Sequence, residues 1–166
     1  MYIFGIDAGS KKTGYVLWDD SKGLMLDCGK VDNEKILDLI IGCPPNTVFV
    51  LEQFRVYAKA GQSIITSATW NGQFIRQIAL RESEHYFYFK SQINKAICGK
   101  GTRVNDKDIR AALTARFPHT GLDGKGNPSV KGTKAHKGPL YGIGTDAWSA
   151  LAVIRTHKKV INGNKK

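Results

Sequence analysis

A short apolar run, Val48-Phe49-Val50-Leu51 followed by Glu52, decides the fold class of this 166-residue chain. Four consecutive apolar residues fit a strand that is covered on both faces, as in a parallel sheet. A similar apolar run, Tyr2 to Ile6, opens the chain and is followed by Asp7. If the two strands lie side by side and parallel, Asp7 and Glu52 meet at their carboxyl ends, where open α/β sheets usually place their sites.

The segments around these two strands predict a mixed sheet flanked by helices. Alternating apolar and helical patterns give strands at Tyr15 to Trp18, Leu24 to Gly29 and His85 to Phe89, and helices at Asn33 to Ile41, Gln62 to Leu80, Asn105 to Arg116 and Asp146 to His157. This order of strands and helices indicates an α/β layer. The Gly- and Lys-rich stretch from Gly121 to Gly138 is expected to be a loop.

Length and composition indicate one basic globular domain. The chain has 25 Lys and Arg residues against 14 Asp and Glu residues, a net charge of +11, with 42% hydrophobic residues. We expect residues 1–160 to form a single domain and residues 161–166 to form a basic, disordered tail. Because the three cysteines lack a ligand or disulfide spacing and no apolar run is long enough to cross a bilayer, the sequence favours a reduced cytoplasmic protein.

The positive charge is concentrated between Lys90 and Lys137. This window holds 11 Lys and Arg residues and three Asp residues, a net charge of +8. Such a surface attracts polyanions, and nucleic acid is the commonest polyanion inside a cell. A ribosome-associated or merely basic surface is the alternative.

A third isolated carboxylate, Asp146, precedes the apolar helical stretch Ala147 to Ile154 and would complete a cluster with Asp7 and Glu52. Three carboxylates without His or Cys suit Mg²⁺ or Mn²⁺. Beside a basic half of the chain, they favour phosphodiester hydrolysis with two metal ions. Each has a local alternative: Asp7 can cap its loop, Glu52 can pair with Arg55, and Asp146 can interact with a helix amino terminus.

Four segments of the chain carry a resemblance to a known family. They are Phe4-Gly5-Ile6-Asp7-Ala8-Gly9, Val50-Leu51-Glu52-Gln53-Phe54, Gln92 to Gly101, and Asp146-Ala147-Trp148-Ser149-Ala150-Leu151-Ala152. In this order they resemble the RuvC family of Holliday-junction resolvases, and more closely the smaller RuvC-like resolvases of bacteriophages. The phage-type features are Gly132-Thr133-Lys134, the stretch Gly138 to Gly142, and Asp-x-Trp at Asp146 to Trp148.

The resemblance implies an RNase H-like fold with a five-stranded mixed sheet, a homodimer, and metal-dependent paired nicking of four-way DNA junctions. Asp7, Glu52 and Asp146 match the family's catalytic carboxylates, with two Mg²⁺ or Mn²⁺ ions per site. Ser149 stands where the family has its fourth metal ligand. Ser149 cannot supply a charge, but it lies one helical turn from Asp146 and can face the same site.

Further matching residues imply contacts with branched DNA. Phe54 matches an aromatic residue that the family places beside the junction bases, where stacking needs no particular sequence. A core phenylalanine that follows a strand is the alternative. The residues expected to contact phosphates are Lys95, Lys100, Arg103, Lys107 and Lys134.

Trp70 and Phe74 widen the apolar face of the helix expected at Gln62 to Leu80, which suggests a subunit interface. A well-buried helix is the alternative. Two other functions stay open. Ser149 permits a junction-binding module with weak or no catalysis, and the stretch Gly5 to Gly14 resembles the first phosphate loop of actin-like ATPases. Those ATPases bind nucleotide between two domains, whereas this chain is long enough for one.

Overall fold

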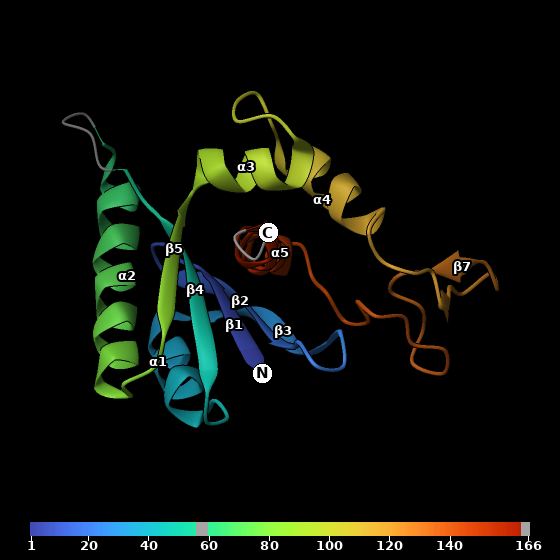
Figure 1. The fold of residues 1–166 in the computed structure, drawn as a ribbon, viewed down its shortest axis with the longest axis horizontal. Coiled ribbons are helices and arrows are strands. Elements are labelled where there is room, and N and C mark those ends of the chain that lie inside the picture. Colours follow the sequence, from blue (N-terminus) through green and yellow to red (C-terminus); the bar gives the residue numbers. More distant parts are fainter. Residues whose placement is uncertain (56–59, 164–166) are drawn as a thin grey trace.

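The computed structural model describes residues 1–55 and 60–163. At its centre lies a five-stranded mixed sheet with the strand order β3-β2-β1-β4-β5 (Figure 1). The strands are β1 (Tyr2–Asp7), β2 (Lys12–Asp19), β3 (Leu24–Asp32), β4 (Thr47–Gln53) and β5 (His85–Phe89). β2 runs antiparallel to β1 and β3, whereas β4 is parallel to β1 and β5. The mixed five-stranded α/β sheet expected from the sequence is therefore confirmed.

Helices cover both faces of the sheet. They are α1 (Asn33–Gly42), α2 (Gln62–Leu80), α3 (Lys90–Cys98), α4 (Asp106–Thr114) and α5 (Ala147–Gly163). α1 and α2 lie on one face, and α5 lies on the other with α3 and α4 beyond it (Figure 1). The segment expected to be a loop contains two short strands, β6 (Gly121–Leu122) and β7 (Pro128–Ser129), and projects from the body of the molecule (Figure 1).

The alternation of side chains along the strands decides which way the carboxylates face. In β1, Ile3 belongs to the core beneath α5, whereas Phe4 and Ile6 belong to the core against α1 and α2. β4 alternates in the same manner. Because successive side chains point to opposite faces, the next position in each strand puts Asp7 and Glu52 on the side of α5.

Helix α5 lies close to β1 because Gly5 has no side chain. A Cβ atom on Gly5 would lie 2.5 Å from the main-chain oxygen of Ala150 and 2.7 Å from Cγ1 of Ile154. Either contact would force the helix outward. The glycine thus lets the first turn of α5 approach the carboxyl end of β1.

The sequence pattern does not predict α3. The helix follows β5 without an intervening turn, and the N–H of Phe89 donates to Oε1 of Gln92 over 2.8 Å at its start. Gly99 ends the helix with a φ of 75°. Its buried residues Ile93 and Ile97 are one turn apart, a signal too short to distinguish a helix from a strand by itself.

The structure corrects the expected start of the C-terminal tail and, for Phe74, supports the alternative of a well-buried helix. Residues 161–163, expected to begin a disordered tail, are the last residues of α5, and residues 164–166 lie outside the described residues. Phe74 is fully buried in the core against α1, and Trp70 stacks on it with ring centroids 6.0 Å apart. Phe74 is therefore a core residue rather than an interface residue. Within the described ranges, no helix combines the length and apolar character needed to cross a bilayer.

Candidate active site

Asp7 and Glu52 lie at adjacent strand ends. The parallel register pairs Ile6 with Leu51, so the next residue of each strand is a neighbour of the other. From α2, Asn71 donates its Nδ2 hydrogen to the main-chain oxygen of Glu52 over 3.1 Å and ties this end of β4 to the helix. The expected meeting of these two carboxylates at one edge of the sheet is present in the structure.

Burial gives both carboxyl groups raised pKa values. For Asp7, loss of water raises the pKa, the Lys90 ammonium and a hydrogen bond with Ser149 oppose the rise, and repulsion from Asp106 and Asp146 adds to it. For Glu52, burial raises the pKa to about 7; Lys90 opposes this rise and the charge of Asp7 adds to it. Burial therefore disfavours the ionised form of both carboxyl groups unless a cation compensates it.

Asp146 immediately precedes α5, and a second glycine, Gly14, leaves the space that lets Asp146 lie close to the site. Gly14 of β2 pairs with Asp7, and a Cβ atom there would lie 2.5 Å from the main-chain oxygen of Asp146. The carboxylate of Asp146 is 48% exposed, and its Oδ1 lies 3.0 Å from Nζ of Lys30 on β3. Sequence reasoning missed Lys30 because the contact joins residues 116 positions apart.

Two pockets open at this edge of the sheet. One, of about 250 Å³, is lined by Asp7, Asp106, Ile109, Arg110, Thr145, Asp146, Trp148 and Ser149. The other, of about 290 Å³, is lined by Glu52, Gln53, Phe54, Arg55, Phe89, Lys90 and Ser91. Asp7, Asp146 and Ser149 therefore share one pocket, whereas Glu52 opens into the neighbouring one.

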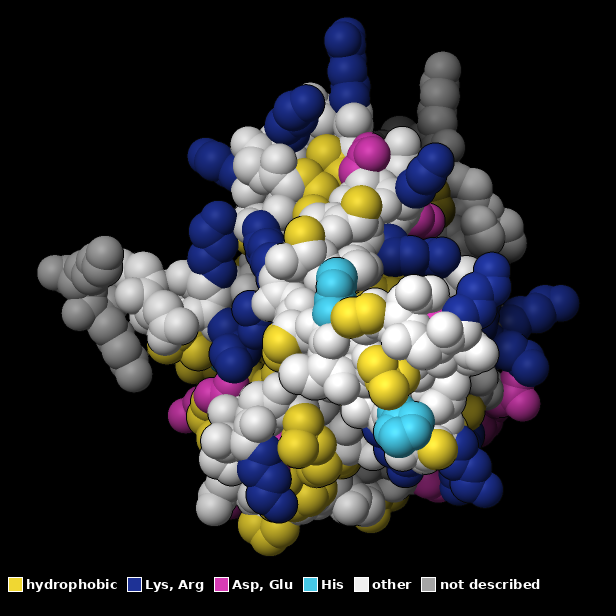
Figure 2. Space-filling model, turned by 90° about the vertical axis from the view of Figure 1, so that its right-hand side faces the viewer, with side chains coloured by type: hydrophobic (Ala, Val, Ile, Leu, Met, Phe, Trp, Pro, Cys, Tyr) yellow, Lys and Arg dark blue, Asp and Glu magenta, His cyan; other side chains and the backbone are white. Residues whose placement is uncertain are grey.

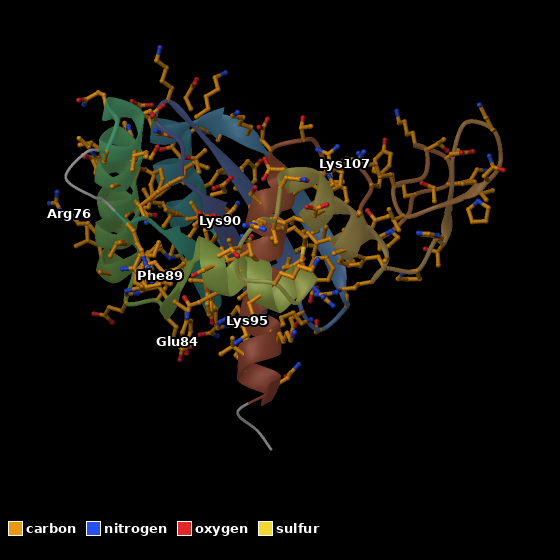
Figure 3. The ribbon with its side chains drawn as sticks, turned by 90° about the horizontal axis from the view of Figure 1, so that it is seen from above. Arg76, Glu84, Phe89, Lys90, Lys95 and Lys107 are labelled. Atoms are coloured by element: carbon orange, nitrogen blue, oxygen red, sulfur yellow. The ribbon has the colours of Figure 1, made fainter. Side chains whose placement is uncertain are left out.

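Lys90 and Asp106 also belong to the site. The sequence analysis includes them only in the net charge of the segment from Lys90 to Lys137. Nζ of Lys90 lies 3.8 Å from Oε2 of Glu52 and 4.0 Å from Oδ1 of Asp106. Figure 3 shows Lys90 at the start of α3, near the middle of the molecule. One signal for Lys90 was available: it directly follows β5, the third parallel strand, and so stands at the same sheet edge.

The three carboxylates do not form the closed cluster expected from the sequence. In residues 1–55 and 60–163, no group of three Asp, Glu, His or Cys side chains is arranged to hold a metal ion. Glu52 is instead paired with Lys90, and Asp146 is paired with Lys30. Their chemistry still fits Mg²⁺ or Mn²⁺, because buried carboxylate oxygens are hard donors whose raised pKa a divalent cation would lower.

The local alternatives for two residues are also decided. Arg55 does not neutralise Glu52; its guanidinium lies 4.4 Å from the centroid of the Phe89 ring. Phe54 is half-buried, packs against the core beside α2, and still borders the pocket that holds Glu52. Phe54 thus serves the core while part of its ring remains accessible beside the site.

The residues expected to contact phosphates are all on the surface. Lys95, Lys100, Arg103, Lys107 and Lys134 are exposed, and none of these five forms an ion pair with another described residue. Lys95 and Lys107 lie on opposite sides of α3 (Figure 3). Lys and Arg side chains outnumber acidic ones over the face at the end of the molecule that carries β6 and β7 (Figure 2). The Lys and Arg side chains seen in this view are spread over the face rather than arranged in one line.

Part of the basic window serves the fold instead. Arg116 donates to the main-chain oxygens of Ala96 and Ile97 at the end of α3. Nζ of Lys131 donates to the main-chain oxygen of Ile143 over 2.9 Å. The charge available to a polyanion is thus smaller than the sequence count indicates.

The comparisons with known proteins address the fold. No protein-family model and no curated protein sequence matches the chain. Among solved structures, the chain is similar to RuvC from Thermus thermophilus, with a TM-score of 0.68 and 14% identity over 99% of this chain and 97% of that one. A structure of T. thermophilus RuvC in complex with a Holliday junction substrate matches with a TM-score of 0.63 and 14% identity over 98% and 95%. The protein therefore has a RuvC-like fold of the RNase H type.

Proposed function

We propose that this protein is a metal-dependent endonuclease that resolves four-way DNA junctions by paired nicking. The observation that carries the proposal is the pair of partly buried carboxylates, Asp7 and Glu52, at adjacent strand ends of a RuvC-like fold. The phage-type motifs around Lys134 and Trp148 favour a small bacteriophage-type resolvase. Such an enzyme would act in the cytoplasm of a bacterial host.

Asp7, Glu52 and Asp146 are the residues that would hold two Mg²⁺ or Mn²⁺ ions, with Ser149 beside them. Bound divalent ions would supply activation of water and stabilisation of the leaving oxygen in phosphodiester hydrolysis. Ser149 lines the same pocket as Asp7, and its hydroxyl group opposes the rise in the pKa of that carboxyl group. The exposed lysines would contact phosphates, and the accessible part of the Phe54 ring would stack on an unpaired base.

We also propose that the active form is a homodimer, because two equivalent sites are needed to nick two strands of one junction. With Phe74 assigned to the core, the large apolar side chains that α2 leaves exposed are Ile64, Ile65 and Leu80, which are 41%, 43% and 69% exposed. We propose Ile64 and Ile65 as residues of the dimer interface in place of Phe74.

The test is cleavage of a labelled four-way junction in Mg²⁺ or Mn²⁺ by the wild-type protein and Asp7→Asn. Asn keeps the size of the side chain and removes its charge, so we expect normal junction binding and at least about 100-fold slower cutting. Asp38→Asn is the matched control, because Asp38 is exposed on α1 and pairs only with Lys35 among the described residues. Equal cutting by Asp7→Asn would contradict the proposal.

One observation favours a second function, a junction-binding module with little nuclease activity. Ser149 brings no charge to the site, and Lys30 and Lys90 already neutralise two carboxylates. Junction binding without nicks in either metal would favour this module over the nuclease.

A further inference from the structure

The carboxylates of the candidate site already have a cation beside them, the ammonium group of Lys90. Its Nζ lies 3.8 Å from Oε2 of Glu52 and 4.0 Å from Oδ1 of Asp106. Its charge also opposes the rise that burial causes in the pKa of Asp7. One ammonium group therefore acts on acidic side chains from β1, β4 and α4.

Local helix chemistry does not explain a lysine at this position. Lys90 is the first residue of α3, where the helix dipole disfavours a positive charge. The next lysine of the same helix, Lys95, lies in the last turn, where the dipole favours it. The position of Lys90 is thus favourable only because of the carboxylates that face it.

The geometry is that of a counter-ion that can leave. Distances of 3.8 and 4.0 Å exceed the roughly 2.7–2.9 Å of a charge-assisted hydrogen bond, so no single tight bond holds the ammonium group. The Lys90 side chain is 43% exposed, whereas that of Glu52 is 13% exposed. The lysine can turn toward solvent while the buried carboxylate stays in place.

We propose that Lys90 is a resident counter-ion of the carboxylates, which a divalent cation has to displace when the site is loaded. The inference rests on the proposed function only in taking Glu52 and Asp7 as metal-binding residues. Lys90 is then a positioning residue. Without metal it holds Glu52 and Asp106 together against their mutual repulsion, and it competes with the cation for the same oxygens.

The test is the affinity for Mn²⁺ without DNA, measured by calorimetry and by the electron paramagnetic resonance of free Mn²⁺. Lys90→Met removes the competing charge, so it should bind Mn²⁺ about two- to fivefold more tightly, the range expected for one half-exposed ion pair. Lys90→Arg should restore an affinity close to wild type. Lys35→Met is the matched control, because it removes an exposed pair with Asp38 on α1 and should leave Mn²⁺ affinity unchanged.

Unchanged or weaker Mn²⁺ binding by Lys90→Met would overturn the assignment. Lys90→Gln repeats the measurement with a polar side chain if the methionine variant does not fold. A second readout is thermal unfolding in a chelator at pH 8, where Lys90→Met should unfold at a lower temperature than wild type. An equal unfolding temperature would count against the counter-ion role.

The two proposals fail in distinguishable ways. If Lys90→Met binds Mn²⁺ more tightly but neither protein cuts a junction, the role of Lys90 is supported and the nuclease is refuted. If wild type cuts junctions while Lys90→Met binds Mn²⁺ with wild-type affinity, the nuclease is supported and the role of Lys90 is refuted.

Discussion

Glu52→Gln should make the metal-free protein more stable at pH 8. In the folded chain, burial raises the pKa of Glu52 from 4.5 to about 7, so ionisation of this group opposes folding. A tenfold change in a protonation equilibrium corresponds to about 1.4 kcal/mol, so the gap between 4.5 and about 7 corresponds to roughly 3 kcal/mol. Gln cannot ionise and avoids this loss, which already includes the attraction of Lys90, but its amide group also loses water on burial. We expect a net gain of about 1–3 kcal/mol.

The direction of the pH dependence follows from the raised pKa of Glu52. Below about pH 4.5 the group is protonated in both the folded and the unfolded chain, and it does not alter stability. Between pH 4.5 and about 7 the unfolded chain releases the proton first, so the wild-type protein loses stability as pH rises. Above about pH 7 the loss is complete and constant.

The assay is urea unfolding of wild type and Glu52→Gln in a chelator, at intervals from pH 4.5 to 8. The difference between the two free energies of unfolding should be near zero at the acid end and should grow to its full value by about pH 7.5. Glu84→Gln is the control, since Glu84 is exposed and should give no such trend. A difference that does not change with pH, or a less stable Glu52→Gln at pH 8, would refute the reasoning about burial.

The remaining predictions concern the approach of α5 and the binding surface. Gly14→Ala should destabilise the fold by about 1–3 kcal/mol and slow junction cutting, because its Cβ would lie 2.5 Å from the main-chain oxygen of Asp146. Urea unfolding measures the first effect and junction cleavage the second. Cutting at the wild-type rate would argue against this packing. Junction affinity should fall steeply with added salt, and Lys134→Ala should reduce the slope of log affinity against log salt by about 0.9. A flat salt response would exclude phosphate contacts.

The carboxyl ends of strands were the most predictable part of the site. Apolar runs before Asp7 and Glu52 indicate buried strands, and parallel neighbours bring such ends together. Gly5 and Gly14 lie inside the expected region, but nothing local in the sequence shows that α5 approaches them. That contact depends on a helix more than 130 residues away in the chain.

Other features could not be predicted from local pattern. The spacing of Phe74 on α2 is the same for an interface and for a core, and only the packing of α1 beside α2 decides for the core. α3 begins without a turn, so Lys90 reads as one more residue of a basic stretch. Whether a lysine belongs to the surface or to the site depends on the acidic residue that it faces. Lys90 begins α3, whereas its partner Glu52 lies on β4.

The sequence by itself determined the α/β class, the strand ends that bear acidic residues, and the division into a nearly neutral half and a basic half. These depend on hydrophobic periodicity and composition, which are local properties of the chain. Only the tertiary structure decided which cations face which carboxylates. Lys30 lies on β3 and Lys90 begins α3, far in sequence from Asp146 and Glu52, with which they pair. The strength of a charge pair depends on distance and burial rather than on separation in sequence.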